Sequence, residues 1–383
     1  MENKIGNVRL MQKINRLKIL NFIREQNTAL RPEISSQTGL SFSSVTNIVT
    51  YLMKKNFVVS DGSVVEGRVG RRADLLRFRN DAYNFICVLI EKDGFTVAFT
   101  DLKGNILRRK YVEITEGERD SLLQNVVTEI NAMTDICGKD TLLSVCIVIS
   151  ALVLKEDIYS AELNWHIDLS RHNLREKLNV EVFVENTSDM RAVWEFKGKT
   201  KENKNVLFFD LDGGIGAVHF TGGEVNPNTI GEIGHTTVKI DGEPCVCGNR
   251  GCLEVMCSVN RIVADCEKFG CINFDDVLNA FYSGDRKVVP SLDMCGEYMG
   301  IGLANLVNIF NPEKIVINGG DFLKCGYIID KAISCLYKRA NKLLTKNMAI
   351  SKVEISKDEI IKGTALFMCD KIFSLEYESD LLD

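Results

Sequence analysis

A glycine-rich stretch in the second half of the chain carries its most specific pattern: residues 231–258 read GEIGHTTVKIDGEPCVCGNRGCLEVMCS. Cys245, Cys247 and Cys252 follow a Cys-x-Cys-x4-Cys spacing, and His235 precedes them by ten positions. Three thiolates and one imidazole suit tetrahedral Zn²⁺, and the neighbouring glycines allow the tight turns of a small chelating loop. Four protein ligands leave no place for an activated water, so the pattern predicts a structural zinc site. Free cysteines in a loop are the alternative.

Two glutamates accompany these candidate ligands. Glu232 lies three positions before His235, on the same side if this short segment is helical, and Glu254 closely follows Cys252. Two carboxylates and an imidazole held in one small volume can accept hydrogen bonds from the hydroxyls of a sugar. In the alternative interpretation, both glutamates only orient the zinc ligands.

Charge is distributed unevenly along the chain. Residues 1–80 contain 14 basic and 6 acidic side chains, a net charge of +8, so the remaining residues carry −13 of the total of −5. A basic head on an acidic body predicts a polyanion-binding module joined to a second unit. The 13 cysteines show no disulfide-like spacing and residues 1–10 no signal-peptide pattern. We therefore expect a cytoplasmic protein.

The basic head contains a helix-turn-helix pattern. Pro32 fits the first turn of a short helix, Gly39 fits its end, and Ser41 can cap a second helix. That second helix would bury its apolar face and expose small polar side chains suited to the major groove of DNA. These candidate DNA-binding residues are Ser43, Ser44, Thr46 and Asn47. An ordinary helical hairpin with a polar face is the alternative.

A wing is predicted directly after these helices. Residues 57–60 and 75–79 are typical of two short strands, and the intervening DGSVVEGRVGRRAD is rich in glycine and arginine. Arg68, Arg71 and Arg72 could enter a minor groove or bind phosphates, although a solvated charged loop is the simpler alternative. We therefore expect residues 1–80 to form a winged helix-turn-helix domain.

Two segments of the acidic body share one pattern, a strand, a glycine-bearing turn and a second strand. They lie near residues 84–101 and 205–221. This repetition predicts a duplicated α/β architecture with two lobes. The segments ENTSD, GGIGAVHFTGGEV, GEIGH…CVCGNRGCLE and NPEKIVINGGD follow in that order, with NWHIDL ahead of them. Together they resemble the ROK family (repressors, open reading frames, sugar kinases), and the resemblance covers essentially the whole chain.

The resemblance implies an actin-like, hexokinase-like two-lobed ATPase fold. Residues 81–195 would form the first lobe, with a C-terminal helix at 360–383 packing back on it, and residues 196–359 the second lobe with the zinc loop. A winged helix ahead of such a body is the layout of the family's transcriptional repressors. The residues matching the family's sugar pocket and its surroundings are Asn164, Asn186, Glu232, His235 and Glu254.

The resemblance also shows what this chain lacks as a kinase. Glu91 and Asp93 stand where the family's first phosphate loop has glycines and threonine, and Asp212 enters the second loop. These carboxylates would repel a polyphosphate. Thr187 occupies the position of the catalytic aspartate, and a threonine hydroxyl is no base near neutral pH. Asp189, two residues further on, is expected to point elsewhere.

We therefore expect a sequence-specific DNA-binding regulator, a repressor of carbohydrate-utilisation genes, rather than an enzyme. Its expected partners are a double-stranded DNA operator and a sugar ligand, its cofactor is structural zinc, and its assembly is a homodimer or homotetramer. Two alternatives stay open at this point. One is an ATP-dependent sugar kinase of the ROK family, and the other is a regulator whose body responds to no ligand.

Overall fold

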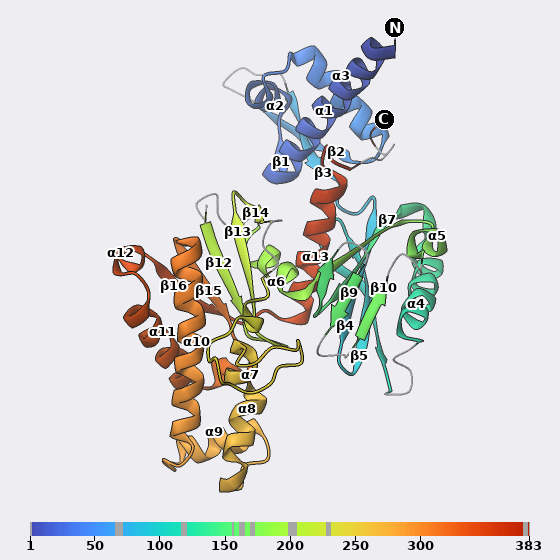
Figure 1. Ribbon diagram of the computed structural model, residues 1–383. Coiled ribbons are helices and arrows are strands. Elements are labelled where there is room, and N and C mark those ends of the chain that lie inside the picture. Colours follow the sequence, from blue (N-terminus) through green and yellow to red (C-terminus); the bar gives the residue numbers. More distant parts are fainter. Residues whose placement is uncertain are drawn as a thin grey trace.

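The computed structural model describes residues 2–65, 72–115, 121–154, 157–160, 165–168, 173–197, 205–226, 231–377 and 382. A small N-terminal head sits above two lobes, and the final long helix rises between the lobes towards the head (Figure 1). None of the described helices combines the length and apolar character needed to cross a bilayer.

The head consists of three helices followed by an antiparallel hairpin. Its helices are α1 (Glu2–Gln26), α2 (Arg31–Thr38) and α3 (Phe42–Lys54), and its strands are β1 (Thr28–Ala29), β2 (Val58–Val65) and β3 (Arg72–Phe78), in the sheet order β1-β3-β2. Gly39 ends α2 with a φ of 71°, which a side chain would disfavour. Ser41 caps α3 by accepting a hydrogen bond from the Ser44 amide at 3.2 Å. These are the elements that a winged helix-turn-helix domain requires, and the assignment of the head to that class stays a prediction.

Each lobe is built on a five-stranded sheet, and the two sheets share one topology. In each, a three-stranded antiparallel meander is followed by two strands that add in parallel beside the first strand. The first sheet has the order β11-β7-β4-β5-β6 and contains β4 (Asn84–Glu91), β5 (Gly94–Asp101), β6 (Ile106–Glu113), β7 (Leu142–Ile149) and β11 (Glu181–Asn186). The second has the order β14-β13-β12-β15-β16 and contains β12 (Asn205–Asp210), β13 (Gly216–Thr221), β14 (Glu224–Val225), β15 (Lys314–Asn318) and β16 (Ala349–Val353). The duplication predicted from the sequence is confirmed.

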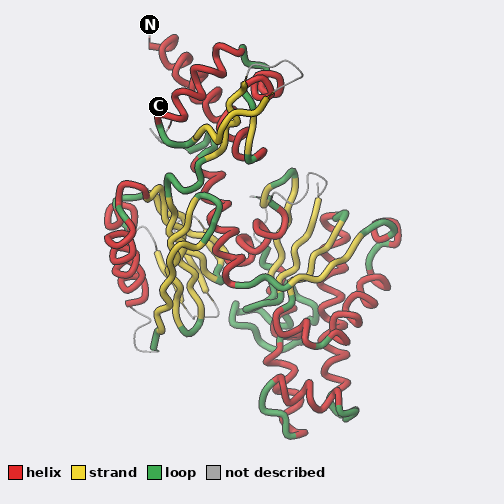
Figure 2. Tube along the Cα trace, turned by 180° about the vertical axis from the view of Figure 1, so that it is seen from behind, coloured by secondary structure: helices red, strands yellow, loops and turns green. Residues whose placement is uncertain are grey.

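The sheets are covered by helices on both faces, as continuous apolar strands require (Figure 2). In the first lobe, the side chains of Ile86, Val88 and Ile90 pack with those of α4 (Leu122–Cys137), while Phe85 and Leu89 face the opposite layer. The remaining first-lobe elements are β8 (Leu152–Leu154), β9 (Asp157–Ser160), β10 (Trp165–Asp168) and α5 (Leu174–Leu178). The remaining second-lobe helices are α7 (Leu253–Cys257), α8 (Val259–Cys266), α9 (Phe274–Tyr282), α10 (Val289–Phe310), α11 (Gly326–Arg339) and α12 (Lys342–Thr345).

Two helices cross between the lobes. The helix α6 (Thr187–Phe196) carries the chain from the first lobe to the second, and α13 (Lys357–Ile372) returns to pack on it. They approach closely at Gly363, where a Cβ atom would lie 2.3 Å from the Met190 carbonyl oxygen. The helix differs in its bounds from the predicted C-terminal helix at 360–383. It begins three residues earlier, directly after its N-cap Ser356, and it ends at Ile372.

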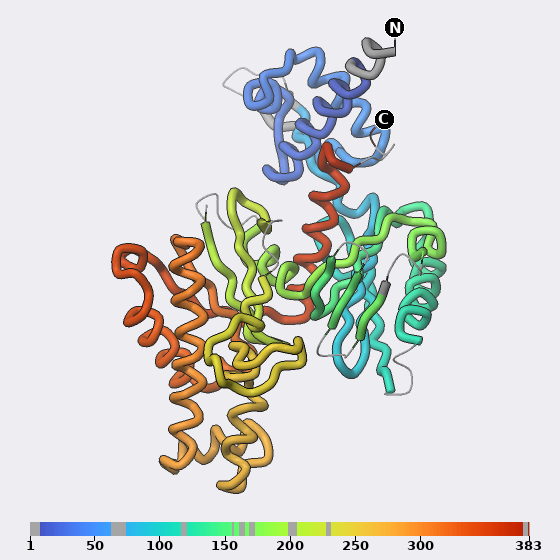
Figure 3. The backbone as a smooth tube through the Cα atoms, in the orientation of Figure 1, coloured from blue at the N-terminus to red at the C-terminus, as the bar shows by residue number. Residues whose placement is uncertain are grey.

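The end of α13 inserts into the head (Figure 3). The Phe373 ring meets those of Phe57 and Phe78 edge-to-face, with centroids 5.4 and 6.3 Å apart, and its carbonyl accepts a hydrogen bond from Asn21 Nδ2 at 3.0 Å. Arg24 of α1 pairs with Asp370 at 2.5 Å. Head and body thus share one apolar core. We propose the division into a head of 1–80, a first lobe of 81–195 with α13, and a second lobe of 196–356.

Candidate functional site

The candidate metal ligands come from a loop that folds back on itself between β14 and α7. A single 3-10 turn, Ile233–His235, places the histidine, and two isolated bridges, Thr237–Cys252 and Pro244–Arg250, close the loop behind it. Gly251 permits the close approach, since a Cβ atom there would lie 1.6 Å from the Lys239 carbonyl oxygen. The loop brings together the side chains that the sequence singled out.

The geometry of this cluster fits a tetrahedral ion. The ligand atoms of His235, Cys245, Cys247 and Cys252 all lie within 4.8 Å of one another. The Sγ atoms of Cys247 and Cys252 are 3.7 Å apart, and Cys245 Sγ lies 3.5 Å from His235 Nδ1. Zinc bonds of about 2.3 Å to sulfur and about 2.0–2.1 Å to nitrogen predict edges of about 3.8 and 3.5 Å. These four residues could hold a metal ion.

The two glutamates beside the cluster have different environments. Glu232 Oε2 lies 3.6 Å from His235 Nε2, the ring nitrogen that faces away from the cysteine. This contact suits a carboxylate that orients a metal-binding histidine. Glu254 Oε2 instead accepts a hydrogen bond from the Ile215 amide at 3.1 Å, in the second glycine loop. The orienting role is therefore favoured for Glu232, and Glu254 braces the neighbouring loop.

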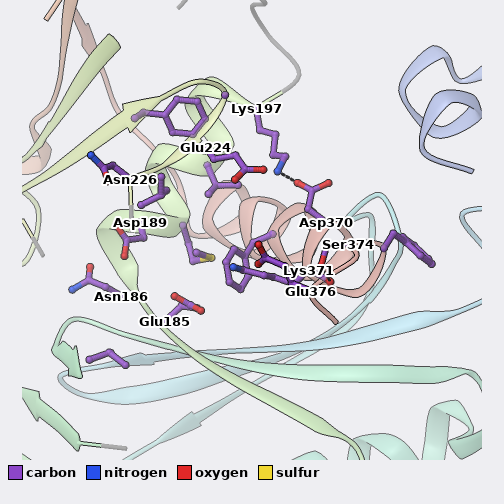
Figure 4. Close-up of a pocket in the computed structure, with 18 of the residues that line it drawn as sticks. Glu185, Asn186, Asp189, Lys197, Glu224, Asn226, Asp370, Lys371, Ser374 and Glu376 are labelled. Carbon is purple, nitrogen blue, oxygen red and sulfur yellow. Dashed lines mark hydrogen bonds and ion pairs between the residues drawn. The ribbon is translucent and has the colours of Figure 1, made fainter. Parts of the chain in front are cut away.

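A cavity of about 890 Å³ lies between the lobes and extends to the head. Its wall is formed by α1, β11, α6, the β13–β14 hairpin and the end of α13 (Figure 4). Of the predicted sugar-binding residues, Asn186 and Glu232 line this cavity, whereas His235 and Glu254 are not part of the wall. Asn164 lies outside the described residues.

Two carboxylates on the cavity wall were missed or misplaced by sequence reasoning. Glu185, from the end of β11, and Asp189, from the first turn of α6, both line the cavity beside Asn186. Burial raises the pKa of Glu185 to about 8, with the negative charge of Asp189 adding to the effect, and burial raises the pKa of Asp189 to about 7. The expectation that Asp189 points away from the site is wrong, because α6 begins at Thr187 and its first turn directs Asp189 into the cavity.

The side chains that match the catalytic aspartate and the second phosphate loop of a kinase are either buried or paired within the protein. Thr187 is buried, and its Oγ1 has no hydrogen-bond partner among the described residues. Buried Arg191 donates to Asp210 Oδ2 at 2.7 Å and to Asp212 Oδ2 at 2.6 Å. Although burial opposes its charge, these two carboxylates raise the pKa of Arg191. Asp212 is thus an ion-pair partner rather than the free repulsive charge that the sequence suggested.

The turn that matches the family's first phosphate loop, at Glu91 and Asp93, also differs from the expectation. Glu91 pairs with Lys357 of α13 at 2.7 Å, so its charge is also compensated. The hairpin that follows is tight at Gly94, because a Cβ atom there would lie 2.3 Å from the Val112 carbonyl oxygen. The charges of Glu91 and Asp212 are therefore both compensated within the protein.

Four of the seven candidate DNA-binding residues lie on one helix, α3. Ser43 and Asn47 are exposed on α3, and Ser44 and Thr46 are partly covered. The Thr46 hydroxyl donates to the Phe42 carbonyl at 2.8 Å, and the Ser44 hydroxyl lies 2.9 Å from that of Ser41. The wing residues Arg68 and Arg71 lie outside the described residues, and Arg72 begins β3 with its side chain not described.

The comparisons with known proteins agree with this architecture. The model of the ROK family matches residues 85–370, most of the chain. The chain belongs to the ROK family. Among its relatives, the xylose repressor of Bacillus subtilis (strain 168) is 28% identical over 325 residues, covering 82% of this chain and 84% of the repressor. The DNA-binding transcriptional dual regulator NagC of Escherichia coli (strain K12) is 25% identical over 388 residues, covering 95% and 94%.

Solved ROK structures share the fold. A ROK family transcriptional regulator, a homologue of the E. coli MLC protein, superposes with a TM-score of 0.76 at 23% identity, covering 93% of this chain and 96% of that one. A ROK family glucokinase from Streptomyces griseus, in complex with glucose and AMPPNP, gives a TM-score of 0.58 at 19% identity and covers 74% of this chain and 98% of the kinase. The kinase thus matches about three quarters of the chain, and the regulator nearly all of it.

Proposed function

We propose that this protein is a sequence-specific, DNA-binding transcriptional repressor of carbohydrate-utilisation genes, and that its body senses a sugar or sugar derivative. The proposal is carried by the insertion of α13 into the three-helix head. The chain also covers 84% of a relative named xylose repressor and 94% of one named DNA-binding transcriptional dual regulator. A rigid contact between a ligand-binding body and a DNA-binding head is what such a switch requires.

In this proposal, Ser43 and Asn47 of α3 approach base edges in the major groove, with Ser44 and Thr46 beside them, and Arg68, Arg71 and Arg72 of the wing contact phosphates. Two heads from a homodimer or homotetramer would read a pseudo-palindromic operator. The ligand would occupy the space between the lobes, where Asn186 and Glu232 meet the cavity. Asn164, His235 and Glu254 are proposed to support that site.

We infer that the body transfers no phosphoryl group, because Thr187 replaces the general base and its hydroxyl is buried. The His235–Cys245–Cys247–Cys252 cluster is proposed to bind a structural Zn²⁺, since four protein ligands complete its coordination. None of the thirteen cysteines forms a disulfide, which suits a reducing cytoplasm.

The proposal is tested by operator retention and by ATP turnover, measured on the same preparation. We expect the full chain to retain DNA from its own upstream region at low salt, and a sugar panel to stimulate no ATP hydrolysis above background. Robust sugar-dependent ATP turnover would establish the kinase alternative instead. Retention that no sugar or sugar derivative changes would identify a regulator whose body responds to no ligand.

A further inference from the structure

The cavity between head and body has an unusual balance of charge. Three lysines face six carboxylates on its wall. Apart from Glu185 and Asp189, the charged groups that face the cavity are Lys18, Lys197, Glu224, Glu232, Asp370, Lys371 and Glu376. They come from α1, the end of α6, the β13–β14 hairpin, the zinc loop and α13 with the residues after it, so the acidic excess is shared by several elements of the wall.

The lysines are largely committed elsewhere. Lys18 Nζ donates to the Thr38 carbonyl at 2.6 Å, within the head. Lys197 forms an ion pair with Asp370. Lys371 remains, and its charge lowers the pKa of Glu185 without cancelling the effect of burial. The cavity therefore has little free positive charge with which to hold an anionic ligand such as a sugar phosphate.

Two of the carboxyls and one amide oxygen, by contrast, have no partner among the described residues. Within the described residues, neither Glu185 nor Asp189 forms a hydrogen bond or an ion pair, although both face the cavity. Asn21 of α1 also lines the cavity, and its Oδ1 is fully buried without a hydrogen-bond partner in the described chain. A fully buried amide oxygen such as Asn21 Oδ1 is costly unless a donor reaches it, whereas the two unpaired carboxyls face the open cavity. A ligand that brings donors could satisfy these groups, and beside two carboxylates a positive charge is favoured.

We propose that this cavity binds a polyhydroxylated ligand that carries a protonated amine, of the amino-sugar class, with its ammonium group between Glu185 and Asp189. The cavity volume of 890 Å³ falls within the range of small-molecule sites, about 300–1,000 Å³. Hydroxyl groups of the ligand meet Asn21 on the head, so the ligand touches α1 and the lobes at once. This inference rests on the proposed function, because the same site is the sensor.

Proton linkage follows from the state of the two carboxyls. Their raised pKa values, about 8 and about 7, leave Glu185 mostly protonated and Asp189 about half protonated near pH 7 in the free protein, and an ammonium ion favours their ionised forms. Binding of an amine therefore releases protons, whereas binding of a neutral sugar does not. Between about pH 6 and pH 7, where the amine stays charged, affinity should rise by up to about tenfold for each proton that binding releases.

The experiment uses the full-length protein and three matched sets of probes. Glucosamine, galactosamine and mannosamine are each compared with the parent hexose and the N-acetyl derivative, first by thermal shift and then by calorimetry at both pH values. We expect at least one amine to bind at least about tenfold more tightly than its two neutral counterparts, with proton release visible in buffers of different ionisation enthalpy. The double variant Glu185→Gln/Asp189→Asn should lose this preference, and the control Glu267→Gln, which changes an exposed carboxylate outside the cavity wall, should keep it.

Equal or tighter binding of the neutral sugars, binding of no amine, or a preference that survives in the double variant would overturn the inference. Operator retention is measured on the same samples so that the two claims separate. Retention without any amine preference removes only this inference. Amine binding by a protein that retains no DNA removes only the proposed function. The charge-neutral double variant keeps the shape of both side chains, and its thermal transition verifies that it folds.

Discussion

His235, Cys245, Cys247 and Cys252 lie at the tetrahedral spacing of a zinc site, and this makes the metal proposal directly testable. We expect Cys252→Ser to lose the metal and to lower the melting temperature by several degrees, because the loop then loses its central crosslink. Elemental analysis of the purified protein measures the first effect. Cys257→Ala is the control, since this buried thiol is outside the cluster. Full zinc content in the Cys252 variant would contradict the assignment.

Glu185 and Asp189 predict a dependence of stability on pH. Their folded pKa values of about 8 and about 7 are above the usual values, 4.5 and 3.8. Between these values the folded state holds more protons than the unfolded state, so their stabilising contribution is complete at low pH and is lost as pH rises. From about pH 5 to about pH 8 we expect the loss of this contribution to lower the free energy of unfolding by up to about 3 kcal/mol for each carboxyl.

The measurement is the melting temperature across this pH range, for the parent protein and for Glu185→Gln/Asp189→Asn. The variant should lose less stability on the alkaline side, since amides do not ionise. The exposed Glu376→Gln should follow the parent. A parent curve and a double-variant curve that run parallel would show that these carboxyls do not titrate abnormally.

The roles of some single residues could be predicted from the sequence, and those of others could not. The zinc ligands could be predicted because their chemistry depends on identity and spacing within one short loop. The role of Asp189 could not, because it depends on where α6 begins and on which elements from distant parts of the chain wall the cavity. The ion pairs of Asp212 with Arg191 and of Glu91 with Lys357 likewise join segments that the sequence leaves apart.

At the scale of elements, the contact between α1 and α13 connects the head to the body. Arg24 and Asp370 are mostly buried there, at 18% and 21% side-chain exposure, whereas the comparable pair Arg109–Asp358 is exposed at 61% and 50%. We expect Arg24→Gln to destabilise the protein by about 1–3 kcal/mol and Arg109→Gln by less than about 0.5 kcal/mol, since exposed pairs contribute little. Thermal unfolding compares the two variants. Equal losses of stability in the two variants would show that the buried Arg24–Asp370 pair contributes no more than an exposed pair.

The recognition helix offers a second test at this scale. Ser41 caps α3 through its hydrogen bond with the Ser44 amide, so Ser41→Ala should destabilise the head by about 1 kcal/mol. Asn47→Ala, on the exposed face, should leave the melting temperature unchanged and weaken operator binding at least severalfold. The comparison separates folding from recognition. Unchanged operator affinity in the Asn47 variant would exclude this face as the one that reads DNA.

Across the whole molecule, the duplication of the two lobes could be predicted from the repeated glycine turns. The family resemblance implied the rest of the architecture. The boundaries of α13 were not accessible, because its end depends on Phe373 reaching the core of the head, a contact between residues far apart in sequence. The cavity that spans head and body likewise forms only when elements from distant parts of the chain pack together. In the proposed function, its position beside α1 is what would let a ligand alter DNA binding.

The most direct test is the affinity of the full-length protein for its own upstream DNA, measured by fluorescence anisotropy across a series of salt concentrations. We predict binding at low salt that weakens by at least about tenfold for each doubling of salt, as expected when several basic side chains contact phosphates. The same binding should exceed that for unrelated DNA and should respond to the cavity ligand. Absence of binding at low salt, by protein shown to be folded, would contradict the account.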